Sequence, residues 1–535
     1  MVALSINGQT TIAPVGASLF DCAGRAGVRV PTSCLKNGKC KECVVEVAEG
    51  MEYLSPPTPS ESHLAGHFRL SCQASIAAGD GHVRCHTMRR GHMRIERQAL
   101  GLPSTGARME LDPAVTRDGD RITGPVYGIA MDLGTTTVVL RLLDLETGEM
   151  VADSSFENPQ RFGGSDIMAR IQYDTDHPNK LLRRTLAGYL AHAIEEFPVD
   201  PKSIYEMVVV GNSTMRDLFF RQSVYTIGQS PYRSITEIEM AAGKRTSTSL
   251  VETGRRCLLP IHPQARVYGA PIISGHVGAD AAACLLATDI GREDRLVAIM
   301  DIGTNTELIV GNRHRILAAS CPAGPAFEGG AIACGMPALD GAIEQVRLAA
   351  GNFQLTVIGG GTPQGICGSG LVSLLGELLC TGRMNERGRF EDDGNRIELD
   401  AANGIFFQES DVNELAQAKG ANVAGLQVVF SDYGIRFEDI EVFYLAGGFG
   451  RHLDARAAAS IGLIPPIPSN RMVQIGNAAI EGATIALLSK SKRAELEALV
   501  RRVEHCRLET HPQFFDFFVD GCQFHPIETG AKVTR

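Results

Sequence analysis

The sequence predicts a multidomain α/β protein made of a small N-terminal domain, a linker and two related α/β lobes. The length of 535 residues corresponds to several domains of about 150 residues each. Strand-like and helix-like segments alternate from residue 126 onward. The segment MDLGTTTVVL at 131–140 returns as MDIGTNTELI at 300–309, which indicates two lobes of similar construction.

The composition is that of a folded, soluble protein. Hydrophobic residues make up 44% and charged residues 21% of the chain, which excludes a largely disordered protein. The net charge of −10 disfavours a nucleic-acid partner, because such binding needs a basic surface. No run of about 18 apolar residues predicts a membrane span. The first residues lack the pattern of a signal peptide, so we expect a cytoplasmic protein.

Residues 1–86 form the predicted N-terminal domain. Two short strands flank a turn at Asn7 and Gly8, a short helix follows in SLFDCAGRAGV, and CVVEVAEG reads as another strand. Residues 87–125 are locally basic and rich in turn formers, which is typical of a linker. The repeated strand-turn-strand pattern then places the first lobe at 126–292 and the second at 293–535.

Fourteen cysteines are many for a cytoplasmic chain, where disulfides are rare. Cys34, Cys40 and Cys43 form a C-x5-C-x2-C pattern, and Cys72 follows after 28 intervening residues. Three thiols in one loop and a distant fourth resemble the ligands of [2Fe–2S] ferredoxins, with the longer first gap of the adrenodoxin-like branch. The resemblance implies a β-grasp, ferredoxin-like domain whose metal ligands are Cys34, Cys40, Cys43 and Cys72.

Two alternatives stay open at this site. A structural zinc ion also takes four thiolates, although zinc ribbons usually use two separated C-x2-C pairs. Cys85 competes for the fourth position, but LSCQ around Cys72 resembles the fourth-ligand motif of ferredoxins. Cys22 and a group among small apolar residues are interpreted as buried side chains; this group comprises Cys284, Cys321, Cys334, Cys367 and Cys380.

Two Asp-x-Gly-Thr turns, each after an apolar strand, predict a phosphate site. Asp132 and Asp301 are the candidate catalytic residues, because an Asp at a strand end can hold hydrated Mg²⁺ or orient an attacking water. Glycine permits close approach of a phosphate, while hydroxyl and backbone N–H groups donate to its oxygens. The candidate phosphate-binding residues are Gly134, Thr135, Thr136, Thr137, Gly303, Thr304, Asn305 and Thr306.

A third turn, YLAGGFGRHLD, contains Gly447, Gly448 and Gly450, whose backbone can lie against a purine or a phosphate. Neither a GxxxxGK[ST] P-loop nor a dinucleotide GxGxxG motif follows an early strand. The three turns resemble those of the acetate kinase, sugar kinase, Hsp70 and actin superfamily. That resemblance implies two RNase H-like lobes that bind ATP and Mg²⁺, with Gly447, Gly448 and Gly450 as the candidate adenosine-binding residues. Other glycine-rich turns, such as those with Gly211 and Glu328, are interpreted as ordinary turns.

The whole chain resembles the reductive activators of corrinoid proteins. The resemblance rests on the cysteine pattern, DLGTTT at 132, NPQRFGGSDIMARI at 158, GNSTM at 211, DIGTNTE at 301, ICGSG at 366 and AGGFG at 446. It implies an ATP-hydrolysing enzyme that reduces inactive Co(II) to Co(I) in a partner corrinoid protein. It also implies an upstream donor, such as a ferredoxin, flavodoxin or reductase, and a homodimer.

Three other functions are alternatives for a chain with these motifs. An activator of the 2-hydroxyacyl-CoA dehydratase type would share the ATPase fold, but it bridges a [4Fe–4S] cluster between subunits. A small-molecule kinase fused to a ferredoxin would need a base beside a substrate pocket, and the sequence identifies none. A redox sensor would bind nucleotide and a partner without turnover.

Overall fold

The computed structural model describes residues 2–77, 79–89, 124–177, 179–349, 351–391, 394–447 and 453–528. The described chain divides into two compact units, of which the first ends at Ala270 and the second begins at Pro271. Most of the predicted linker, 87–125, lies outside the described residues. The N-terminal domain and residues 124–270 make up the first unit, whereas 271–292, which the sequence assigned to the first lobe, fall in the second unit. The predicted α/β class with mixed sheets is confirmed.

The N-terminal domain is a five-stranded sheet with one short helix, α1 (Leu19–Arg25). The strand order is β2-β1-β5-β3-β4, and only β1 and β5 run parallel. Alternate residues of β1 are buried, and Asn7 and Gly8 turn the chain into β2 with positive φ angles, as predicted. The strands are β1 (Val2–Ile6), β2 (Gln9–Ala13), β3 (Val44–Glu49), β4 (Phe68–Leu70) and β5 (Gly81–Thr87).

The first lobe has a six-stranded sheet in the order β10-β11-β9-β6-β7-β8. Strands β6, β7 and β8 form an antiparallel meander, and β9 joins β6 in parallel. Its strands are β6 (Tyr127–Leu133), β7 (Thr137–Asp144), β8 (Met150–Glu157), β9 (Ile204–Val210), β10 (Leu250–Thr253) and β11 (Arg266–Gly269). Its helices are α2 (Ile167–Asp176), α3 (Leu181–Glu195), α4 (Ser213–Phe219) and α5 (Ile235–Ala241).

The main sheet of the second unit has the order β21-β20-β12-β13-β14-β22, in which the first five strands match β11-β9-β6-β7-β8 and the sixth, β22, joins the opposite edge from β10. Again three antiparallel strands come first, and two later strands add in parallel beside the first of them. Its strands are β12 (Val297–Asp301), β13 (Thr306–Gly311), β14 (Ile316–Cys321), β20 (Val442–Ala446), β21 (Met472–Gly476) and β22 (Val503–His505). The shared order confirms the duplication that the repeated turn predicted.

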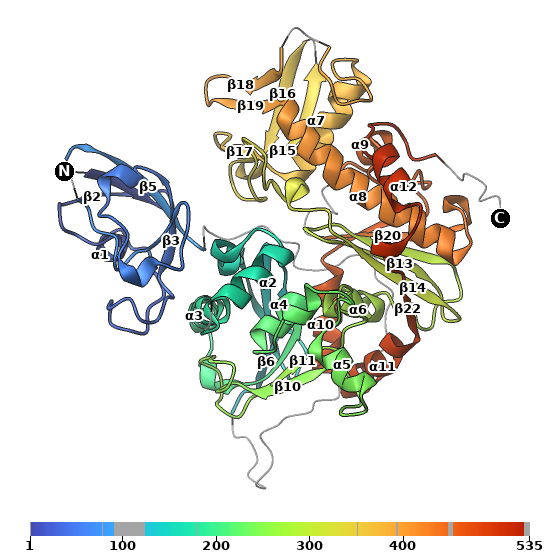
Figure 1. Ribbon diagram of the computed structural model, residues 1–535, viewed down its shortest axis with the longest axis horizontal. Coiled ribbons are helices and arrows are strands. Elements are labelled where there is room, and N and C mark those ends of the chain that lie inside the picture. Colours follow the sequence, from blue (N-terminus) through green and yellow to red (C-terminus); the bar gives the residue numbers. More distant parts are fainter. Residues whose placement is uncertain are drawn as a thin grey trace. The chain divides into compact units, whose positions relative to one another are not determined.

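Helices cover both faces of this second sheet. Gly425 of α8 packs against Leu308, whereas Cys284 of α6 contacts Asp301, and neighbouring strand residues point to opposite faces. Helix α6 also packs against α10, and α12 packs against α8 (Figure 1). The helices are α6 (Ala279–Ala287), α7 (Gly368–Cys380), α8 (Glu409–Tyr433), α9 (Ala455–Ser460), α10 (Ala478–Leu488), α11 (Lys490–Leu499) and α12 (Phe514–Gly521).

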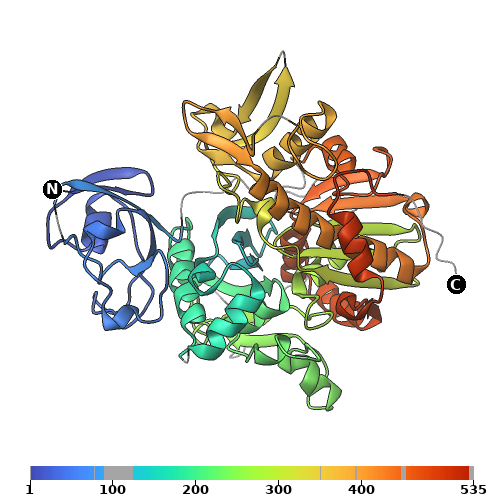
Figure 2. The ribbon, with the colours of Figure 1, turned by 45° about the horizontal axis from the view of Figure 1, so that its top comes forward.

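Two small sheets between β14 and α8 extend the second unit, and both views show them together at one end of it (Figures 1 and 2). One sheet has the order β16-β15-β17, and the other pairs β18 with β19. These strands are β15 (Ala342–Ala349), β16 (Asn352–Val357), β17 (Gly365–Ile366), β18 (Arg396–Asp400) and β19 (Ile405–Gln408).

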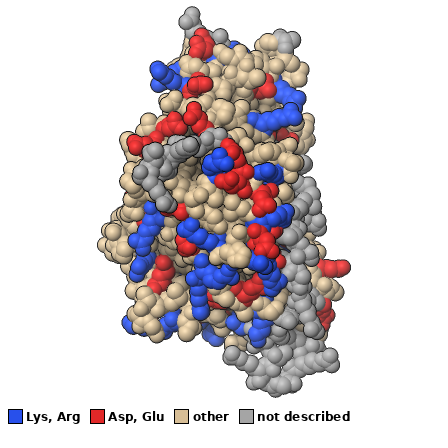
Figure 3. Space-filling model, turned by 90° about the vertical axis from the view of Figure 1, so that its right-hand side faces the viewer, with Lys and Arg blue, Asp and Glu red and all other residues tan. Residues whose placement is uncertain are grey.

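The surface carries charged side chains of both signs (Figure 3). Basic and acidic side chains lie interspersed over the face that Figure 3 shows. Within the described ranges, no helix combines the length and apolar character that crossing a membrane requires. Cys380 is exposed and Cys334 is half-buried, so the expectation that both are buried is wrong.

A buried ion pair holds α4 of the first lobe in place. The side chains of Arg216 and Asp217 are both fully buried and lie 2.7 Å apart. Ser234 donates to the second carboxylate oxygen of Asp217 at 2.6 Å, and Arg216 also donates to two backbone carbonyls. Since a buried charge needs a partner, this pair ties α4 to the segments at Ser234, Thr248 and Ala270.

We expect Asp217→Ala to lower the free energy of unfolding by about 3–5 kcal/mol, because it leaves the Arg216 guanidinium buried without its counter-charge. Urea unfolding followed by circular dichroism measures this loss. The matched control is Glu252→Ala, which breaks the exposed pair of Glu252 and Arg256 and should cost less than about 1 kcal/mol. Equal losses for the two variants would contradict the assignment.

Candidate functional site

The cysteine loop lies between α1 and β3, and Cys72 follows β4. The loop turns tightly, with positive φ angles at Leu35, Lys36, Gly38 and Lys41. At Gly38 the φ angle is 73°, and an added Cβ would lie 3.1 Å from atoms of Gln73 and Ser60. Glycine is therefore required where the loop passes closest to the segment that carries Cys72.

The four predicted thiols lie in two pairs. Cys34 and Cys40 interact through their side chains, and so do Cys43 and Cys72. Among the described residues, no three His, Cys, Asp or Glu side chains form a ready-made site for a single ion. Two pairs of thiols suit a two-iron cluster, in which each iron takes two thiolates.

Backbone N–H groups surround the two more exposed thiols. Burial raises the pKa of Cys34, but hydrogen bonds from Cys40, Lys39 and Asn37 outweigh it and lower this pKa to about 7. The Cys43 thiol and the Gly38 N–H lower the pKa of Cys72 to about 6. Each pair thus contains one thiol that ionises readily, which favours metal binding because the thiolate is the ligand.

The other two thiols, Cys40 and Cys43, have raised pKa values. Burial raises the pKa of Cys40, and the neighbouring Cys72 followed by burial raises that of Cys43. Cys85 lies apart from all four. It is fully buried on β5, where burial raises its pKa to about 12 beside Cys22. The arrangement therefore favours Cys72 over Cys85 as the fourth ligand.

The first Asp-x-Gly-Thr turn closes the end of β6 in the first unit. The Gly134 N–H donates to the Thr137 carbonyl at 2.9 Å, and an added Cβ on Gly134 would lie 2.7 Å from that oxygen. Asp132 is the last but one residue of β6 and pairs with Val210 of the parallel strand β9. Because carboxyl ends of parallel strands meet at one edge, the Gly211–Asn212 loop lies beside this turn.

Two buried asparagines fix the same turn. Asn212 donates to the Thr135 hydroxyl at 2.9 Å, and Asn158 donates to the Gly134 carbonyl at 2.8 Å. The Asn158 N–H also bonds to the Thr136 carbonyl at 2.6 Å. An added Cβ on Gly211 would lie 2.4 Å from the Leu133 carbonyl oxygen. The loop interpreted as an ordinary turn is thus part of the candidate site.

The second turn, in the second unit, surrounds Asp301 at the end of β12. The Cys284 thiol donates to the Asp301 carboxylate with the sulfur and oxygen 3.6 Å apart. Thr304 donates to Glu328, and the Thr304 carbonyl accepts from the Gly324 N–H at 2.8 Å. An added Cβ on Gly303 would lie 3.3 Å from the Asn305 carbonyl oxygen.

Two further carboxylates accompany Asp301. Glu307 pairs with Asp301 across β12 and β13, and its side chain is almost completely buried. Burial, followed by the charges of Asp280 and Asp301, raises the pKa of Glu307 well above its usual value. Ser320 donates to one oxygen of Glu307 at 2.9 Å. The surroundings of Glu307 therefore favour the neutral, protonated form of its carboxyl.

The predicted adenosine turn begins beside Asp301. Gly447 has a φ angle of 109°, and an added Cβ would lie 2.3 Å from the Ile302 carbonyl oxygen and 3.1 Å from an Asp301 oxygen. Its N–H donates to the Gly476 carbonyl at 3.0 Å. Only glycine fits here. Gly448 and Gly450 lie outside the described residues.

The comparisons cover all three parts of the chain. Residues 4–77 match the 2Fe–2S iron-sulfur cluster binding domain, 127–293 match the RACo middle region, and 295–532 match the C-terminal domain of RACo, the ASKHA domain. The corrinoid activation enzyme RamQ of Eubacterium limosum is 34% identical over 430 residues, which cover 75% of this chain and 70% of RamQ.

The chain belongs to the family of corrinoid activators.

Two more relatives of this activator family extend the match. The [Co(II) methylated amine-specific corrinoid protein] reductase of Methanosarcina barkeri is 25% identical, over 76% of this chain and 79% of the relative. A solved structure titled the reductive activator for corrinoid,iron-sulfur protein matches with a TM-score of 0.72 and 25% identity. It covers 98% of this chain and 99% of that one, so the likeness spans the whole activator.

The sequence missed several residues that this activator places at its candidate sites. Asn158 and Asn212 hold the first turn, and Asp280, Glu307 and Glu328 surround the second. Glu307 ends the quoted DIGTNTE motif, so its position opposite Asp301 in a tight turn could have been inferred. Asp280 comes from a helix outside the motif and carries no such signal.

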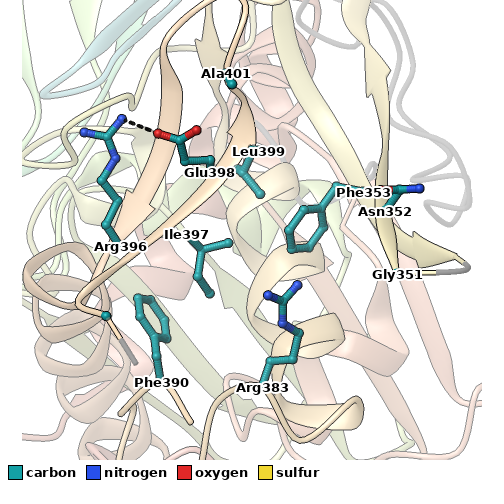
Figure 4. A pocket seen from close by; sticks show the side chains of 11 residues that line it. Gly351, Asn352, Phe353, Arg383, Phe390, Arg396, Ile397, Glu398, Leu399 and Ala401 are labelled. Carbon is teal, nitrogen blue, oxygen red and sulfur yellow. Dashed lines mark hydrogen bonds and ion pairs between the residues drawn. The ribbon is translucent and has the colours of Figure 1, made fainter. Parts of the chain in front are cut away.

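A separate pocket of about 560 Å³ lies among the small sheets of the activator's second unit (Figure 4). Phe353, Phe390 and Ile397 line it together with Arg383 and Arg396. Arg396 is paired with Glu398 at 3.1 Å. No described residue of the cysteine loop or of the three turns lines this pocket, so those residues take no part in it.

Proposed function

We propose that this chain reactivates a corrinoid protein by ATP-dependent, one-electron reduction of its inactive Co(II) to Co(I). The single observation that carries the proposal is the presence, in one chain, of a cluster-binding domain and both activator regions. The names of the two curated relatives support a corrinoid protein as the target. The Co(I) product would sustain corrinoid-dependent methyl transfer.

Cys34, Cys40, Cys43 and Cys72 are the proposed cluster ligands. Cys34 and Cys40 would hold one iron, and Cys43 and Cys72 the other, because the thiols lie in these pairs. A bound [2Fe–2S] cluster accepts and releases one electron. The N–H groups of Asn37, Gly38 and Lys39 point to the sulfurs and stabilise their negative charge.

ATP is proposed because the electron transfer is uphill. The Co(II)/Co(I) couple has a more negative reduction potential than the usual cellular donors. A plant-type [2Fe–2S] cluster has a potential of about −400 mV. Each deficit of about 59 mV in a one-electron step costs about 1.4 kcal/mol. Nucleotide binding or hydrolysis in the two lobes would supply this energy by changing the bound corrinoid protein.

Asp132 and Asp301 are the proposed catalytic residues, and the two turns that follow them the proposed phosphate contacts. Mg²⁺ is usually held by one or two carboxylates together with phosphate oxygens and water, so Asp301 needs no second protein ligand to bind it with ATP. Gly447, Gly448 and Gly450 are the proposed adenosine contacts. In the described structure, Gly447 supports this proposal by bringing its backbone against the Asp301 turn.

Three further features remain proposals. An upstream ferredoxin, flavodoxin or reductase would reload the cluster, and the active form would be a homodimer. A cytoplasmic location is supported by fourteen cysteines that are all free thiols, since disulfides are rare in that compartment.

The test is an ultraviolet–visible assay of candidate Co(II) corrinoid proteins with the reduced holoprotein. We expect the Co(I) spectrum to appear with ATP and not with ADP. Free phosphate should be released, and its release should be stimulated by the corrinoid protein. Equal Co(I) formation without nucleotide would overturn the ATP dependence. Iron at two atoms per chain would separate this protein from dehydratase activators, which share a four-iron cluster between subunits.

A further inference from the structure

One face of helix α3 in the first lobe contacts the cysteine loop of the N-terminal domain. Arg184 donates to the Lys39 carbonyl at 3.1 Å, and Thr185 donates to the Lys41 carbonyl at 3.0 Å. These carbonyls flank Cys40, so the helix engages the backbone that carries the proposed ligands. Both contacts lie within the first compact unit.

The next turn of α3 continues the same contact. The Tyr189 hydroxyl donates to the Val44 carbonyl at 3.0 Å and accepts from the Met88 N–H at 3.2 Å. Tyr189 is fully buried, and burial raises its phenol pKa above the usual value, so the hydroxyl keeps the proton it donates. Val44 directly follows Cys43. Residues 184, 185, 188 and 189 lie on one helical face.

Ion pairs and a further hydrogen bond surround this contact. Arg29 pairs with Glu195 at 3.3 Å and Arg89 with Glu196 at 2.6 Å, both at the end of α3. Elsewhere, Arg161 pairs with Glu46 at 3.1 Å, and the Tyr173 hydroxyl donates to the His63 carbonyl at 2.9 Å. Contacts spread over α2, α3 and the loop before α2 define one orientation of the domain.

The contact divides the cysteine loop into a closed and an open side. Cys40 and Cys43 are almost completely buried, at 3% and 1% exposure. Cys34 and Cys72 are half-buried, and Leu35, next to Cys34, is 93% exposed. The side that meets α3 is therefore shielded from water, and the edge of Cys34 and Cys72 stays open.

We propose that α3 is a docking surface for the cysteine loop, and that Arg184, Thr185 and Tyr189 are positioning residues that keep the cluster's reduction potential low. The inference rests on the proposed function, in which these cysteines hold the cluster. A reduced cluster carries more negative charge than an oxidised one. Water stabilises that charge, so excluding water from the Cys40–Cys43 side lowers the potential.

This effect matters for the proposed reaction, since Co(II) demands a strong reductant. In the docked state the first lobe makes the cluster a stronger donor, and the open edge of Cys34 and Cys72 remains available for electron exchange. The nucleotide-binding lobe and the cluster are thereby linked through α3, because β6 with its Asp132 turn belongs to the same unit.

Gly188 provides a selective way to break the contact. An added Cβ at Gly188 would lie 3.0 Å from the Cγ atom of Glu42. Alanine can push this flexible side chain aside, whereas leucine needs the loop itself to move. Gly24 of α1 offers a matched control, since no heavy atom lies within 4 Å of its added Cβ. Both substitutions put one leucine on a helix and change no charge.

The experiment compares the full-length holoproteins Gly188→Leu, Tyr189→Phe and Gly24→Leu with the parent. In Gly188→Leu we expect amide hydrogen exchange at 39–46 to rise by at least about tenfold, and the midpoint potential to become more positive. Tyr189→Phe should raise the exchange rate and the midpoint potential by smaller amounts. Gly24→Leu should change neither the exchange rate nor the potential. Unchanged exchange and potential in Gly188→Leu, or equal shifts in Gly24→Leu, would overturn the proposal.

Electron paramagnetic resonance separates this proposal from the assignment of the ligands. An unchanged signal intensity in Gly188→Leu means that all four ligands are in place, so a shifted potential then reports the lost contact. A parent protein that binds no [2Fe–2S] cluster would refute the proposed function itself. Retained docking at 39–46 in such a protein would still leave α3 as a docking surface without a redox role.

Discussion

A Cys72→Ala protein is expected to lose the visible absorption and the paramagnetic signal of the [2Fe–2S] cluster. Cys72 contacts Cys43, and under the proposed ligand assignment its removal would leave one iron with a single thiolate from the chain. The half-buried position of Cys72 lets the cluster dissociate once that ligand is gone. Anaerobic reconstitution, followed by iron and sulfide analysis and an absorption spectrum, measures the loss.

Cys85→Ala is the matched control for this substitution. Cys85 is the alternative fourth ligand, and it lies in the core of the N-terminal domain on β5. We expect its replacement to leave iron content and spectrum unchanged. A Cys72→Ala protein with a full cluster, together with a Cys85→Ala protein without one, would reverse the assignment.

The cysteine spacing was sufficient to predict the type of cluster, but not the grouping of the thiols. Cys34, Cys40 and Cys43 are neighbours in sequence, yet Cys43 lies with Cys72 rather than with Cys40. That grouping depends on β3 and β4 being antiparallel neighbours, with Val44 opposite Leu70. A contact between strands so far apart in sequence leaves no local pattern.

The two lobes were predictable because the same turn occurs twice, each time after an apolar strand. The strand orders of the two sheets confirm this duplication. The contact between the cysteine loop and α3 could not be predicted. It uses backbone carbonyls of Lys39, Lys41 and Val44 as acceptors, and every residue type provides a carbonyl. Only the helix side of the contact depends on side chains.

Replacing Asp301 is expected to have a large effect on ATP hydrolysis. Asp301 ends β12, the Cys284 thiol bonds to it, and Glu307, whose pKa is raised, lies opposite. We expect Asp301→Asn to lower ATP hydrolysis by about 10²–10⁴-fold, the range found when a positioned acid or base is removed. The cluster should keep its full spectrum, because its proposed ligands belong to the other unit. Release of free phosphate measures the effect.

Glu307→Gln is the sharpest comparison for this substitution. Glu307 lies opposite Asp301 in the same turn. Burial and the charges of Asp280 and Asp301 raise the pKa of the Glu307 carboxyl well above the usual value. Because the raised pKa favours the neutral carboxyl, a neutral amide is a close substitute, and hydrolysis should stay within a few-fold of the parent. The same amide at Asp301 removes a charge. Equal losses in both variants would show that the turn needs its shape rather than the Asp301 charge, and would remove Asp301 from the catalytic residues.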